Sequence, residues 1–138
     1  MFDEALRIVK TKHIVYTPDA TMQAMLSDAQ GRVLIVEPGI GYHEKNKRYS
    51  LITNYSLLNP DSTRPYIVLG NDRYERAISL LNQCGSNFTV SDAFSILRTV
   101  QQEGVWASRV SFVYSSKKRT VFYVENNHFE QVLTYKFD

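Results

Sequence analysis

Two short clusters in this chain carry side chains suited to binding or polarising an amide. In the first, Asn54 follows Tyr49-Ser50-Leu51-Ile52-Thr53, a stretch otherwise built for burial. A side-chain amide at the end of such a strand can donate to a developing oxyanion or hold a substrate carbonyl. It can equally satisfy backbone groups at its own strand end. From the residues alone, both interpretations of Asn54 stay open.

The second cluster, Asp72-Arg73-Tyr74-Glu75-Arg76, is typical of the first turn of a helix. Arg73 and Arg76 are unfavourable there, because the helix macrodipole prefers acidic residues near its N-terminus. In one interpretation, Asp72 and Glu75 compensate by pairing with the arginines in an exposed turn. In the other, a cation is kept at this position because it faces an anion or a thiolate in a functional site.

The remaining candidates for catalysis or metal binding are weaker. Cys84 is the only cysteine, and its predicted place at the C-terminal end of a helix disfavours a thiolate, so we interpret it as a buried filler. The three histidines, at positions 13, 43 and 128, lack the spacing of metal ligands. No P-loop, GxGxxG, HExxH or paired CxxC motif occurs, so we expect neither a metal nor a cofactor.

Composition limits the class of protein. The 138 residues fit one domain, 1–138, and 43% hydrophobic with 12% aromatic residues is ordinary for a globular protein. The net charge of +2 comes from interspersed acids and bases, which does not suggest nucleic acid. We see no apolar run of about 20 residues and no signal peptide, and the single cysteine fits a reducing compartment. We therefore expect a cytoplasmic protein that does not associate with membranes.

The hydrophobic pattern predicts an α+β fold. We expect helices over 2–9, from Asp72 to about Cys84-Gly85, and from a Thr89 cap to about Gly104, and strands over 22–27, 32–37, 49–55, 108–114, 120–125 and 131–137. The segment 38–48 is polar and is predicted to be a loop. Hairpin-length links within each strand set indicate antiparallel sheet layers with packed helices. Val33-Leu34-Ile35-Val36 does not alternate, so it should form a central strand covered on both faces.

The order of these pieces resembles the C-terminal half of the linear amide C–N hydrolases, the choloylglycine hydrolase and penicillin acylase group of N-terminal-nucleophile (Ntn) enzymes. The resemblance is carried by a hydrophobic strand pair around a D-x-x-G turn that ends in an acid, a Thr-Asn strand end, an Arg-aromatic pair that opens a helix, a Thr-Val-x-Asp-Ala helix start and the closing strands. Here these are Asp28 to Glu37, Thr53-Asn54, Arg73-Tyr74, Thr89 to Ala93 and Val121 to Asn126.

By resemblance, Asn54 would polarise the scissile amide and Arg73 would support the charge state of the site. The family starts with a catalytic cysteine, whereas this chain starts Met1-Phe2-Asp3. We therefore expect half of an Ntn-type αββα sandwich that is inactive alone, with a small-molecule amide as substrate. Its partner would be a second copy or a complementary N-terminal chain. The alternative is a non-catalytic binding or assembly module with the same half-fold.

Overall fold

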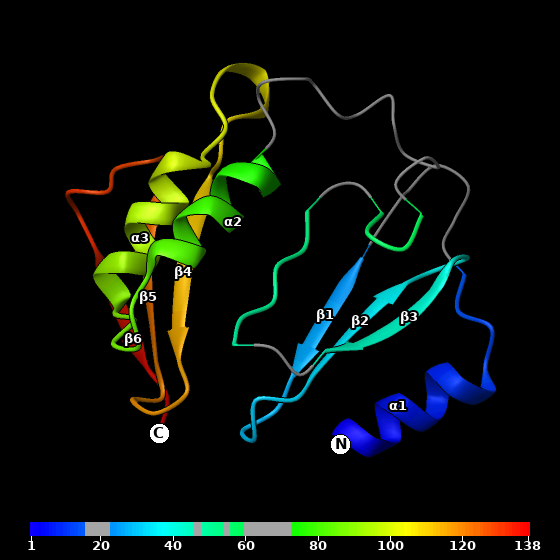
Figure 1. Ribbon diagram of the computed structural model, residues 1–138. Coiled ribbons are helices and arrows are strands. Elements are labelled where there is room, and N and C mark those ends of the chain that lie inside the picture. The colour runs from blue at the N-terminus through cyan, green and yellow to red at the C-terminus, as the bar shows by residue number, and fades with distance from the viewer. Residues whose placement is uncertain (16–22, 46–47, 54–55, 60–72) are drawn as a thin grey trace. The chain divides into compact units, whose positions relative to one another are not determined.

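The computed structural model describes residues 1–15, 23–45, 48–53, 56–59 and 73–138 (Figure 1). The helices are α1 (Phe2–Thr11), α2 (Arg73–Gln83), α3 (Val90–Thr99) and the short 3-10 turn η2 (Gly104–Trp106). The strands are β1 (Ala24–Ser27), β2 (Val33–Glu37), β3 (Gly41–Lys45), β4 (Val110–Ser115), β5 (Thr120–Glu125) and β6 (Leu133–Lys136). Two antiparallel three-stranded sheets, β1-β2-β3 and β4-β5-β6, with helices make this an α+β fold. The chain divides into two compact units, Met1–Tyr74 and Glu75–Asp138.

The hairpin of β1 and β2 forms as the sequence predicts. Asp28 accepts backbone bonds from Gln30 and Arg32, and Gly31 adopts a φ of 80°, the left-handed conformation that glycine tolerates. β2 is the central strand, and Leu34, Ile35 and Val36 are all buried. This confirms that the non-alternating run is covered on both faces.

The third strand of this sheet is not where the sequence predicts it. β3 lies at Gly41–Lys45, within the segment expected to be a loop, and pairs along the whole of β2. A tight turn makes this possible: Pro38 favours the bend, Gly39 has a φ of 77°, and the Ile40 N–H donates to the Glu37 carbonyl at 3.0 Å. The predicted strand at 49–55 is wrong for 49–53, which form no strand, while 54 and 55 lie outside the described residues.

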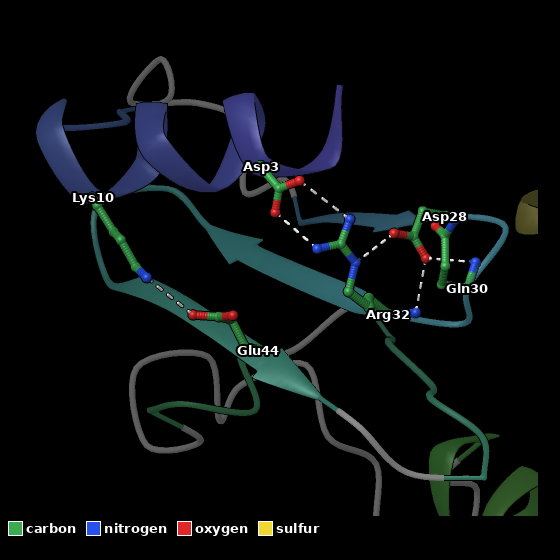
Figure 2. Close-up of polar contacts among 6 residues, drawn as sticks. All are labelled: Asp3, Lys10, Asp28, Gln30, Arg32 and Glu44. Atoms are coloured by element: carbon green, nitrogen blue, oxygen red, sulfur yellow. Dashed lines mark hydrogen bonds and ion pairs between the residues drawn. The ribbon is translucent and has the colours of Figure 1, made fainter.

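Helix α1 packs on one face of the β1–β3 sheet through charged contacts at both of its ends (Figure 2). Near its start, Asp3 accepts from the Arg32 guanidinium at 2.8 Å, and near its end Lys10 pairs with Glu44 at 3.4 Å. Glu44 is aligned with the buried Leu34 on β2, so both residues lie on the face that α1 covers. On this side of the sheet, Val9 of the helix and Val36 of β2 line the same hollow.

In the second unit, α3 begins with the capping box that the sequence predicts. The Asp92 N–H donates to the Thr89 hydroxyl at 3.2 Å, and the Thr89 N–H donates to the Asp92 carboxylate at 2.8 Å. These bonds satisfy backbone donors that a helix start leaves unpaired. The helix ends at Thr99, before Gly104, which has a φ of 69° and opens η2.

The second sheet is a meander in which residues at the turns adopt positive φ. Arg119, at a φ of 50°, closes the β4–β5 turn, and Asn126 and Asn127, at 50° and 62°, follow β5. Helix α3 packs against β4, and the face toward the helices holds Val124, which is fully buried, and Thr120. The sequence predicts all three strands to within two residues at each end.

Candidate functional site

The two site residues that the sequence predicts have different outcomes. Arg73 is the first residue of α2, where the sequence predicts a helix start, and it is half-buried. Asn54 lies outside the described residues, and so does Asp72. Their predicted convergence on one cleft therefore stays a prediction.

The most unusual polar group in the described part of the chain is Glu37, the last residue of β2. It is only 2% exposed, although glutamate is rarely buried unless it is paired. Its carboxylate accepts from the Leu57 N–H at 2.9 Å, from the Leu58 N–H at 3.3 Å and from the buried Ser56 hydroxyl. Three donors converge on one carboxylate, which offsets the cost of burying its charge.

Ser56 extends this cluster by accepting from the Asn59 N–H at 2.7 Å while it donates to Glu37. The carboxylate therefore fixes the backbone of residues 56–59 against the end of the central strand. These residues follow Thr53-Asn54 by two positions in the sequence. From the sequence alone, Glu37 can be recognised only as the acid that ends an apolar strand. Its burial depends on hydrogen-bond donors about 20 residues later in the chain.

Cys84 has the surroundings of a structural thiol. It follows the last residue of α2, is half-buried, and its Sγ donates to the Leu80 carbonyl at 3.3 Å. A thiolate there would face the carbonyl end of the helix, which opposes negative charge. A surface hollow of about 400 Å³ between α2 and α3 adjoins it. Among the described residues lining that hollow, the one carboxylate is Asp92, which is occupied by the α3 cap.

A second hollow, of about 180 Å³, lies in the first unit between the end of α1 and the β2–β3 turn. Lys12, His13, Glu37 and Tyr42 contribute its polar side chains, and Val9 and Val36 lie in its apolar wall.

The described residues contain no group of three or more His, Cys, Asp or Glu side chains that could hold a metal ion. His128 instead pairs with Glu130, Nδ1 to Oε1 at 3.0 Å. The Glu130 backbone N–H and His128 both favour the carboxylate, which lowers the pKa of Glu130. Both side chains are exposed, so this pair is a local contact on the surface.

The charged cluster Asp3–Arg32–Asp28 stabilises the first unit (Figure 2). Hydrogen bonds from Arg32 lower the pKa of Asp3 and, against the opposing effect of burial, also that of Asp28. The two carboxylates in turn raise the pKa of Arg32, whose guanidinium also lies 4.3 Å from the centre of the Phe2 ring. All these groups are engaged with one another, which indicates a structural role.

Comparisons with protein-family models, with curated proteins and with solved structures find no match to this chain. Within the described residues, no helix combines the length and the apolar character needed to span a bilayer.

Proposed function

We propose that this chain is a segment of a hydrolase that acts on linear amide C–N bonds, built as half of an Ntn-type sandwich and inactive alone. The observation that carries the proposal is the buried Glu37 carboxylate, bonded to Ser56, Leu57 and Leu58. It joins two pieces of the resemblance, the acid that ends a hydrophobic strand and the segment following Thr53-Asn54. An amide can polarise a substrate only from a fixed position, and Glu37 fixes residues 56–58, which follow Asn54 in the sequence.

In this proposal the roles are divided between two side chains. The Asn54 amide donates to the substrate carbonyl oxygen, which gains negative charge as the nucleophile attacks. The Arg73 guanidinium, at the start of α2, stabilises negative charge in the site. The substrate is a small acylated amine or conjugated amino acid.

The nucleophile is not among the groups described. Cys84 is the only cysteine in the sequence, and its thiol is committed to the Leu80 carbonyl. This same observation favours the second candidate function, a non-catalytic binding or assembly module with the same architecture. The two candidates differ in whether Asn54 and Arg73 matter to an amide hydrolysis reaction.

The deciding experiment supplies the nucleophile on a second polypeptide. The DNA directly upstream of this reading frame is sequenced, and any in-frame segment or neighbouring frame that yields an N-terminal cysteine is co-expressed with this chain. We expect the chain alone to release no amine from acylated substrates, and the pair to be active. Asn54→Ala and Arg73→Ala should each lower kcat/KM of the pair by about 100-fold or more. The control variants Asn87→Ala and Arg98→Ala, both exposed, should not.

An active pair that tolerates Asn54→Ala and Arg73→Ala would contradict the assigned roles. Turnover by the chain alone that Cys84→Ser abolishes would contradict the whole proposal. The absence of any upstream cysteine segment would favour the non-catalytic module.

A further inference from the structure

The sheet β4-β5-β6 carries a continuous apolar surface, here called the outer face. The strand register puts Phe112, Tyr123 and Leu133 in one row across the sheet, and Tyr114, Val121 and Tyr135 in the next. Aligned residues on neighbouring strands share one face. The outer face is completed by Val110 in β4 and by Phe137, which follows β6 and packs edge-on against Tyr114 and Tyr135.

This face exposes its largest apolar side chains. Along β4, Val110, Phe112 and Tyr114 are exposed, whereas the residues between them, Ser111, Val113 and Ser115, are half-buried toward the helices. A sheet with one face in water normally has the opposite pattern, with apolar residues toward the core and polar ones outward. The sequence of β4 is therefore suited to a second apolar layer rather than to solvent.

The exposed area is large enough for a stable interface. Phe112 is 63% exposed, Tyr135 60% and Tyr114 53%. At about 200 Å² for a fully exposed aromatic side chain, the exposed residues of the outer face present roughly 600 Å². Two such faces packed together would bury about 1,200 Å², the lower end of the range for specific protein–protein interfaces.

The charges at the two ends of the sheet favour a second copy of this chain as the occupant. Glu125 lies at the Val110 end, and Lys117 and Arg119 lie in the turn at the opposite end. The Lys118 ammonium of the same turn lies over Phe122, on the helix side of the sheet. A twofold axis across the strands would place the acidic end of one copy against the basic end of the other, twice. The centre of the outer face is uncharged, so nothing there repels an identical copy.

We infer that the outer face of β4-β5-β6 is a homodimer interface, in which two copies pack face to face about a twofold axis that crosses the strands. This inference stands whether or not the chain is a hydrolase segment, because it uses no residue of the proposed site.

The test is the mass of the full chain in solution, measured by light scattering and sedimentation up to about 100 µM. We expect twice the chain mass of 15.9 kDa. Phe112→Lys, at the centre of the face, should raise the dissociation constant by about 100-fold or more. Val105→Lys is the matched control, since Val105 is 91% exposed but lies in η2, outside the sheet.

Two further variants keep the inference testable. Should Phe112→Lys lose the circular dichroism of the folded chain, Tyr135→Lys replaces it. Glu125→Lys should weaken the dimer about 10-fold, and adding Lys117→Glu should restore it. A monomer at every concentration would overturn the inference, as would a dimer unaffected by folded Phe112→Lys or Tyr135→Lys. A dimer that forms normally with Glu125→Lys would overturn the proposed axis.

Discussion

The two sheets of this chain differ in whether their apolar side chains are buried or exposed. In the first, the central strand β2 is buried on both faces, with Leu34 0% and Ile35 1% exposed. In the second, β4 alternates and directs Phe112 and Tyr114 outward. A run without alternation thus marks a strand already covered within its own unit, whereas an alternating strand with aromatic residues outward marks a face that needs another layer.

The largest effect should come from the strand buried on both faces. Leu34→Ala removes a fully buried side chain and leaves a cavity, so it should lower the free energy of unfolding by about 2–5 kcal/mol. Leu26 is the matched control, because it is aligned with Leu34 on the neighbouring strand but is 40% exposed. Leu26→Ala should cost about 1 kcal/mol in urea unfolding. Equal losses would mean that β2 is not the core of its unit.

Removing the buried carboxylate tests whether the end of β2 is held by polar contacts. Glu37→Ala leaves the Ser56 hydroxyl and the Leu57 and Leu58 N–H groups without their acceptor. We expect a loss of roughly 2–4 kcal/mol, with faster amide hydrogen exchange at 57–59. The exposed pair Lys10–Glu44 provides the control, since Glu44→Ala should cost less than about 1 kcal/mol. Unchanged exchange at 57–59 would contradict the anchoring role.

These two residues also show what the sequence could and could not predict. Leu34 lies in a run whose composition alone indicates a buried strand. The burial of Glu37 depends on donors from residues 56–58, far along the chain, and no local pattern encodes them. For the same reason, the sequence located the acid as part of a resemblance but not as the centre of a hydrogen-bond cluster.

The strands likewise divide into those that the sequence could predict and those that it could not. The hairpin at Asp28–Gly31 and the β5 strand were predictable because Gly and Asn mark their turns and apolar residues their length. β3 was missed because Gly41 to Glu44 are all exposed and mostly polar, so only pairing with β2 makes them a strand. Tyr49 to Thr53 were mistaken for a strand because Tyr49, Ile52 and Thr53 are residue types that favour strands, but these positions are half-buried without a ladder.

In the second unit, the stability of α3 should depend on the capping box at its N-terminus. Thr89→Ala removes the hydroxyl that accepts from the Asp92 N–H and should cost about 1 kcal/mol in urea unfolding. The control is Thr99→Ala, in the last turn of α3, where the hydroxyl donates to the Ser95 carbonyl. Its loss should be below about 0.5 kcal/mol. A larger loss at Thr99 than at Thr89 would mean that the capping box does not set the start of α3.

The smallest expected effect is the loosening of α1 in acid. Because the pKa values of Asp3 and Asp28 are lowered by Arg32, their contribution to stability is present above the ordinary value of 3.8 and is lost as pH falls through the lowered values. In an NMR titration both carboxyls should show midpoints below 3.8. The variant Arg32→Gln should raise both midpoints toward 3.8. Midpoints that are unchanged in Arg32→Gln would mean that this cluster does not hold α1 on the sheet.

The contrast between the two sheets is tested most directly by measuring unfolding free energies at two protein concentrations, about 1 and 100 µM. Leu34→Ala should cost the same at both, since its contacts lie within one unit. Phe112→Ala should cost little at the lower concentration and about 1–3 kcal/mol at the higher one, where the outer face is covered by a second copy. A cost for Phe112→Ala that does not change with concentration would contradict the difference drawn between the sheets.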